Sequence, residues 1–218
     1  MVTNSEKIRL LLKEFPKTYS EELGIDLESK TPKEIFKWFL ASILFGHRIS
    51  ETIAKNTYKE FEKEGLLTLD KILDAGWDEL VRVLDNGGYV RYDFSTASAL
   101  LDIMKNLKEK YGSLENLYKI SKGSKDLEIK LNEFKKIGPI TVNIFLRELR
   151  VVWPKSDVEV SKFVKLSSKN LGIDLRGLNK KTRGFVNLES ALLRLGKGYC
   201  WKKRCKYCEF KNYCLFLS

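Results

Sequence analysis

Long hydrophobic runs are missing from this chain of 218 residues. The most apolar stretch, Ile35 to Gly46, is shorter than the roughly 18–20 residues that cross a bilayer, and it contains Lys37. The first residues, MVTNSEKIRL, are polar and lack the apolar core of a signal peptide. We therefore expect an intracellular, cytoplasmic protein without a membrane partner.

Strand signals are also missing, since no long stretch alternates apolar and polar residues. We find no repeat of fixed period and no long linker. A content of 43% hydrophobic and 11% aromatic residues nevertheless excludes a disordered chain. Apolar residues recur at helical spacing, which predicts an all-α fold. The expected helices cover residues 6–15, 31–44, 50–64, 68–75, 77–85, 93–110, 113–120, 126–135, 140–152, 158–171 and 184–196.

Acidic residues are the scarcer charge, with 29 Asp and Glu against 40 Lys and Arg, for a formal net charge of +11. Such an excess favours a polyanionic partner, nucleic acid first and an anionic membrane second. A solvated, lysine-rich surface of the kind found in thermophiles is the alternative. Charge alone does not decide between them.

Cysteine is absent from the first 199 residues and then occurs four times within 15. The spacing is C-x4-C-x2-C-x5-C, at Cys200, Cys205, Cys208 and Cys214. In an intracellular chain, clustered cysteines indicate a metal centre more often than disulfides. Four thiolates suit a [4Fe–4S] cluster or tetrahedral zinc. Zinc usually takes two CxxC pairs, so the single pair here favours iron and sulfur, with zinc as the alternative.

Two expected helices meet at a tight turn centred on Gly138. Pro139 follows in the first helical turn, where its missing N–H costs nothing. The free N–H groups of such a helix start form an anion site, and Lys135 and Lys136 flank it. A DNA backbone phosphate is the natural ligand, although Gly-Pro turns between helices are also common without one.

Asp157 directly precedes the apolar pattern of residues 158–171. Aspartate is a preferred N-cap, so we expect Asp157 to cap that helix. A capping carboxylate is held rigidly and can still face a cleft.

These features occur in this order in one family. From about Lys33 to Cys214 the chain resembles the helix-hairpin-helix DNA glycosylases of the endonuclease III superfamily. The resemblance implies two helical domains flanking a DNA-binding cleft, into which a base is flipped from the duplex. We expect residues 33–135 to form a central helical bundle, and residues 1–32 with 136–218 to form the domain that carries the cluster. Asp157 matches the catalytic aspartate, which stabilises positive charge on the deoxyribose and orients or deprotonates water.

The hairpin departs from the family pattern Leu-Pro-Gly-Val-Gly-x-Lys-Thr-Ala. Lys136 replaces the first glycine, Gly138 matches the second, and Ile140 stands where bifunctional members carry a Schiff-base lysine. Isoleucine cannot attack C1′ of the sugar, so the resemblance implies a monofunctional enzyme. A displaced lysine, such as Lys135, Lys136 or Lys155, is the alternative. The cysteine loop is also two residues shorter between its first pair than the family's C-x6-C-x2-C-x5-C.

Further positions take their expected roles from the resemblance. His47, the chain's single histidine, aligns with the glutamine that fills the gap left by the flipped base, and Arg48 would support the strand. Thr141 belongs to the DNA-contacting hairpin. Tyr89 and Tyr92 would stack on the extruded base or else serve as packing aromatics. We assign three tryptophans to the core: Trp38, Trp77 and Trp153. We expect Lys162 to pair with Asp157, contact phosphate or remain solvated.

The sequence thus predicts a monomeric DNA repair glycosylase. It would hydrolyse the N-glycosidic bond of a damaged or mismatched base in double-stranded DNA and be associated with the nucleoid. The alternatives are a bifunctional glycosylase and AP lyase, a non-catalytic iron–sulfur DNA-binding protein, and a zinc-stabilised nucleic-acid module.

Overall fold

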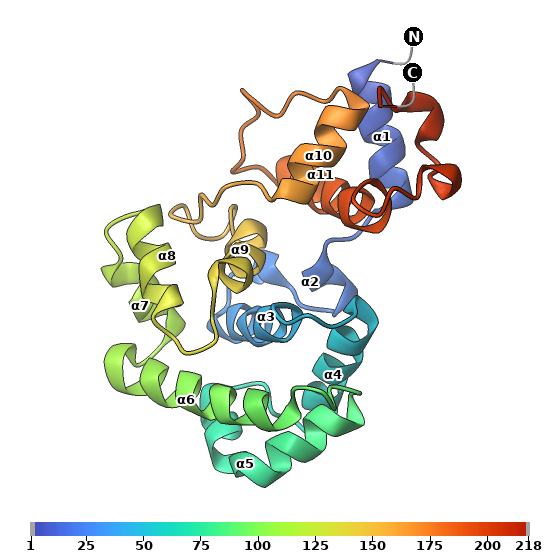
Figure 1. Cartoon of the computed structure of the whole chain (residues 1–218). Helices are drawn as coiled ribbons and strands as arrows, with labels where there is room; N and C mark the ends of the chain where they lie inside the picture. The colour runs from blue at the N-terminus through green and yellow to red at the C-terminus, as the bar shows by residue number, and fades with distance from the viewer. Residues whose placement is uncertain (1–2, 217–218) are drawn as a thin grey trace. The chain divides into compact units, whose positions relative to one another are not determined.

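A computed structural model describes residues 3–216, and within that range the protein is all-helical, without a strand (Figure 1). The all-α prediction is therefore confirmed. None of the helices in this range is long and apolar enough to cross a membrane. The chain divides into two compact units: a central unit, Leu23–Val158, and a terminal unit made of the chain up to Glu22 and from Glu159 onward.

The boundaries between the two units differ from the domain boundaries that we expected. We expected breaks after residues 32 and 135, whereas the structure divides after Glu22 and after Val158. The physical reason is packing, because the helix that follows Gly138 lies against helices of the central unit. The hairpin and Asp157 therefore belong to the central unit, together with His47.

The central unit is built around one buried helix, α3. Trp38 on α3 is fully buried and donates its indole N–H to the carbonyl of Phe145 on α9, at 3.0 Å. Helices α4, α7 and α9 pack on α3, and α5 packs along α6. The elements are η1 (Leu27–Ser29), α3 (Pro32–Phe45), α4 (Glu51–Lys63), α5 (Leu69–Asn86), α6 (Asp93–Tyr111), α7 (Leu114–Ile120), α8 (Ser124–Asn132) and α9 (Pro139–Glu148).

The start of α3 follows directly from the local sequence. Thr31 is the N-cap, and its hydroxyl accepts the N–H of Glu34 at 3.4 Å, while Pro32 occupies the first turn. The Glu34 carboxylate in turn accepts the N–H of Asp26 at 3.0 Å. Such a cap stabilises a helix by about 1 kcal/mol, and the predicted start of this helix is confirmed.

The terminal unit joins the first helices to the last. In Figure 1, α1 lies beside α11, which packs on α10. A Cβ added to Gly196 would meet the carbonyl oxygen of Phe163 at 2.1 Å, so only glycine allows this close crossing at the end of α11. The elements are α1 (Asn4–Glu14), α2 (Tyr19–Glu22), α10 (Lys162–Leu171), α11 (Arg183–Leu195), the π-helical turn η2 (Gly196–Cys200), η3 (Cys205–Tyr207) and η4 (Lys211–Tyr213).

Two expectations are wrong. The helix expected at 158–171 begins only at Lys162, and its N-cap is Ser161, whose hydroxyl accepts the N–H of Val164 at 3.4 Å. Asp157 therefore does not cap it. Trp77 is 39% exposed rather than buried, because it lies at the surface, where its N–H is donated to the Ser98 hydroxyl at 3.0 Å. Trp38 and Trp153 are in the core as predicted.

Candidate functional site

The hairpin is formed by α8, a short turn and α9. Gly138 is the N-cap of α9 in extended conformation, and within the described residues no side chain caps this helix. Pro139 occupies the first turn and has no N–H to satisfy. The backbone N–H groups of Ile140 and Thr141 are thus the first donors of α9, at the positive end of its dipole. This geometry can hold an anion such as a phosphate group.

Lys136 adopts a left-handed backbone conformation in the turn, with φ of 64°. An L side chain rarely takes this conformation, which glycine adopts freely. The Lys136 ammonium donates to the carbonyl of Ser95 on α6 at 3.0 Å, and this contact ties the turn to the neighbouring helix. The next lysine back, Lys135, is exposed and pairs with Asp102 at 3.2 Å.

Thr141 connects the hairpin to the segment that follows α3. Its side chain is buried, and a Cβ added to Gly46 would lie 2.1 Å from its hydroxyl. The Thr141 side chain is therefore a packing group. The close approach places His47, the next residue after Gly46, near the hairpin.

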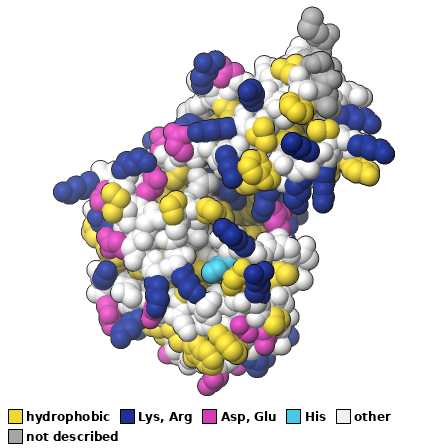
Figure 2. All heavy atoms as spheres, in the orientation of Figure 1, with side chains coloured by type: hydrophobic (Ala, Val, Ile, Leu, Met, Phe, Trp, Pro, Cys, Tyr) yellow, Lys and Arg dark blue, Asp and Glu magenta, His cyan; other side chains and the backbone are white. Residues whose placement is uncertain are grey.

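His47 lies among aromatic rings from the loop before α6. Its ring centre is 5.9 Å from that of Tyr89 and 5.6 Å from that of Tyr92. The imidazole reaches the surface on the face shown in Figure 2. Tyr89 is only 1% exposed, and its hydroxyl donates to the carbonyl of Leu44 at 2.8 Å. Tyr89 is thus a packing aromatic that supports His47, whereas half-buried Tyr92 keeps an accessible ring, with the Arg91 guanidinium 5.5 Å from its centre.

The pKa of His47 lies below its ordinary value because the ring is partly buried and because Lys136 is nearby. In the unfolded chain the His47 imidazole is protonated near pH 6.5, whereas in the folded chain it is protonated only at lower pH. Folding stability contributed by neutral His47 is therefore lost as the pH falls below about 6.5.

We expect an NMR titration of the single imidazole to give a pKa below 6.5, and Lys136→Gln to raise it. Lys135→Gln, one residue away, is the control and should leave the pKa of His47 unchanged. A pKa at or above 6.5 in the wild type would contradict the partly buried position of His47 beside Lys136.

Asp157 is held by an arginine that the sequence reading missed. Arg150 is 1% exposed; its Nη1 donates to Oδ1 of Asp157 at 3.4 Å, and its Nη2 donates to the carbonyl of Val158 at 2.7 Å. The Asp157 side chain itself is half exposed. A carboxylate that is fixed from within the fold and open to solvent on its other side can approach a ligand without losing its anchor.

The lysines considered as displaced nucleophiles all have partners. Lys135 pairs with Asp102 and Lys136 donates to a backbone carbonyl. The Lys155 ammonium donates to the last carbonyls of α7, those of Tyr118 at 2.9 Å and Lys119 at 3.2 Å. Lys155 therefore serves as a C-terminal cap of α7, in line with the negative end of its dipole.

The four cysteines follow α11 in one loop and are free thiols. This loop is fastened to α10 through Asn170, whose side chain hydrogen-bonds the Cys200 thiol and whose backbone carbonyl accepts the N–H of Leu215 at 2.7 Å. Burial raises the pKa of Cys200 to about 11, and the other three thiols act on it electrostatically. Burial also raises the pKa of Cys208.

The donor set fits a thiolate-bound metal by chemistry, since it holds four soft sulfur ligands within mutual electrostatic reach. Within residues 3–216, however, no three cysteine, histidine or acidic side chains are gathered closely enough to hold a metal ion.

Lys162 and Arg48 complete the predicted set. The Lys162 ammonium lies 4.3 Å from the centre of the Trp201 ring, beside the cysteine loop, and this cation–π contact accounts for its position. Trp201 is exposed and meets Phe163 edge-on at 5.5 Å. Arg48 is exposed and follows His47 at the surface.

No protein-family model matches the chain, and no curated protein is significantly similar to it in sequence.

Proposed function

We propose that this protein is a DNA glycosylase that hydrolyses the N-glycosidic bond of a damaged or mismatched base in duplex DNA. The observation that carries the proposal is the half-exposed carboxylate of Asp157, fixed by buried Arg150, in the same unit as the uncapped hairpin. A net charge of +11 supports DNA as the partner.

The hairpin would bind the DNA backbone. The N–H groups at the start of α9 would hold a phosphate, with Lys135 and Lys136 adding positive charge. The left-handed conformation of Lys136 supports the resemblance to the helix-hairpin-helix motif, because the family has a glycine at this position. Each phosphate contact adds to the salt dependence of binding rather than to base selectivity.

Base loss builds positive charge on the deoxyribose. The fixed carboxylate of Asp157 would stabilise that charge and accept a proton from the attacking water, while Arg150 keeps its position constant. His47 and the accessible ring of Tyr92 would contact the DNA bases near the extruded nucleotide, and Arg48 the strand beside them.

The reaction would stop at an abasic site. Ile140, 69% exposed, provides no amine in the first turn of α9, and the three candidate lysines are engaged elsewhere. A Schiff-base step needs a free amine within reach of C1′. This supports a monofunctional glycosylase over a bifunctional one.

The cysteine loop would hold a [4Fe–4S] cluster, or zinc in its place, through Cys200, Cys205, Cys208 and Cys214. Such a group would cross-link the loop and supply no bond-breaking chemistry. The basic residues of the loop would then add affinity for DNA. We further propose that the protein acts on the nucleoid as a monomer.

The proposal is tested by excision from labelled duplexes that each contain a single lesion or mismatch. We expect one of them to give strand breaks only after hot alkali, since alkali cleaves the abasic product. Breaks without alkali, together with borohydride trapping of a covalent adduct, would indicate a bifunctional enzyme. Binding without cleavage of any duplex would favour the non-catalytic DNA-binding alternative.

A further inference from the structure

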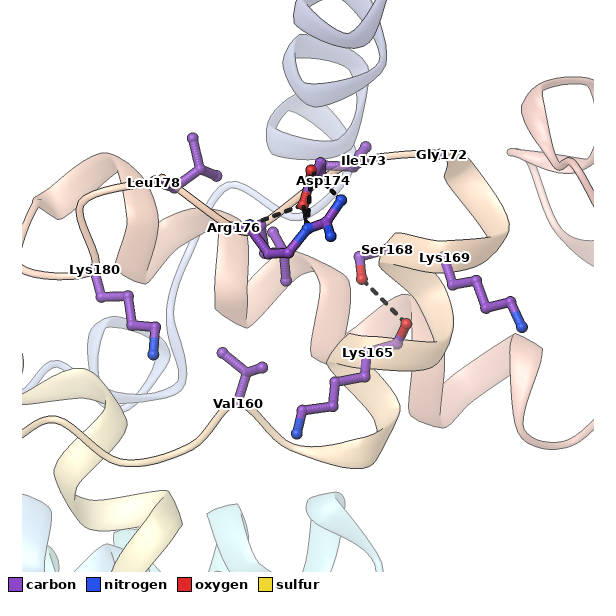
Figure 3. A pocket seen from close by; sticks show the side chains of 12 residues that line it. Val160, Lys165, Ser168, Lys169, Gly172, Ile173, Asp174, Arg176, Leu178 and Lys180 are labelled. Atoms are coloured by element: carbon purple, nitrogen blue, oxygen red, sulfur yellow. Dashed lines mark hydrogen bonds and ion pairs between the residues drawn. The ribbon is translucent and has the colours of Figure 1, made fainter.

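A hollow in the terminal unit has no role in the proposed reaction. It has a volume of about 670 Å³ and lies between α10 and the segment that follows it (Figure 3). Its apolar lining is aliphatic, from Val160, Ile173, Leu175 and Leu178. Leu178 is 40% exposed, so part of this aliphatic lining is open to solvent.

Cationic side chains surround the aliphatic lining. They are Lys165, Lys169, Arg176 and Lys180. In Figure 3 the side chains of Lys165 and Lys180 extend on either side of Val160. Both ammonium groups thus lie at the border of the aliphatic surface.

Two of these cations, Arg176 and Lys165, pair with carboxylates of the chain. Asp174 is held by the Arg176 guanidinium, with Nε to Oδ1 at 3.0 Å and Nη2 to Oδ2 at 2.9 Å. Glu159 pairs with Lys165 at 2.9 Å, but both side chains are well exposed. An exposed pair of this kind contributes little stability, so a ligand carboxylate can replace Glu159 at small cost. Four cationic residues and one acidic residue line the hollow, so its lining carries a net positive charge.

The lining indicates what kind of anion fits. Among the described residues that line the hollow none is aromatic, so a nucleobase would find no ring on which to stack. A bare phosphate would gain nothing from the aliphatic surface. A chain in which acidic and aliphatic side chains alternate satisfies both the cations and the apolar lining.

We propose that this hollow docks an acidic, aliphatic peptide segment of a partner protein. The segment's carboxylates would contact Lys165 and Lys180, and one of its aliphatic side chains would cover Val160 and Leu178. Neither contact involves a residue of the proposed catalytic or hairpin site, so the proposal is independent of the glycosylase activity.

The test uses a short fluorescein-labelled peptide in which glutamate and leucine alternate. We expect saturable binding to the full chain by fluorescence anisotropy. A matched peptide with serine in place of leucine should bind at least about tenfold more weakly, because the aliphatic contact is lost. The double variant K165E/K180E should abolish binding, and Leu178→Ser should weaken it.

The variant K13E/K211E carries the same change of net charge at exposed lysines outside the hollow, and it should bind like the wild type. Thermal unfolding checks that each variant is folded. Equal affinity for the serine peptide, or no effect of K165E/K180E, overturns the proposal. Tighter binding of a labelled oligothymidylate that competes with the peptide would instead make the hollow a nucleic-acid backbone site.

Discussion

Asp157→Asn is expected to abolish base excision while DNA binding persists. The amide is isosteric with the carboxylate and keeps an oxygen that accepts from Nη1 of Arg150, so the local structure is retained. It carries no negative charge and is a poor base. General base catalysis alone contributes about 10²–10⁴-fold to a rate, and loss of charge stabilisation adds to that. Single-turnover excision should therefore fall by at least about 10²-fold.

Binding and stability separate this chemical role from a structural one. The dissociation constant for lesion-containing duplex should stay the same or decrease, because a negative charge that faces the DNA is removed. Glu159→Gln is the matched control, since it neutralises an exposed carboxylate two residues further on and should leave excision unchanged. Wild-type excision rates in Asp157→Asn would refute the catalytic role. A lower melting temperature with parallel loss of binding would make Asp157 a structural residue.

Local signals predicted the elements that position the site. The start of α3 could be predicted because Thr31, Pro32 and Glu34 satisfy its free backbone groups within one turn. The turn between α8 and α9 could be predicted from a different signal, since a Gly-Pro pair ends one helical pattern and begins the next. The break at Gly76 inside α5, with φ of 72°, likewise falls where the sequence separated two helices.

Long-range contacts explain what the sequence reading missed. Asp157 and Ser161 are both good caps, and only the contact of Arg150 with the Val158 carbonyl shows why the chain stays extended until Ser161. Arg150 itself is a charged residue that sequence rules place at the surface, yet the packed unit buries it. For Tyr89 the sequence left base stacking and packing both open, and the hydrogen bond of its hydroxyl to Leu44, far away in sequence, shows the packing role.

Cys208→Ser is the second change with a large expected effect. Cys208 is the most buried of the four thiols, and burial raises its pKa. A serine hydroxyl there stays protonated and is a poor ligand for iron or zinc, so the variant should lose its bound metal. If a [4Fe–4S] cluster is present, the visible absorbance of the purified protein is lost with it; zinc gives no colour but is found by elemental analysis.

Loss of the metal should lower the stability of the protein and its affinity for DNA, but not the rate of base excision. Metal binding contributes roughly 10–16 kcal/mol in small zinc domains, and even about 3 kcal/mol here would lower the melting temperature by about 6–12 °C. The excision rate at saturating enzyme should remain, because Asp157 lies in the central unit and the cysteines in the terminal unit. Lys211→Ala, at an exposed position of the same loop, is the control and should change neither metal content nor melting. A wild-type protein that contains neither iron nor zinc would refute the metal assignment.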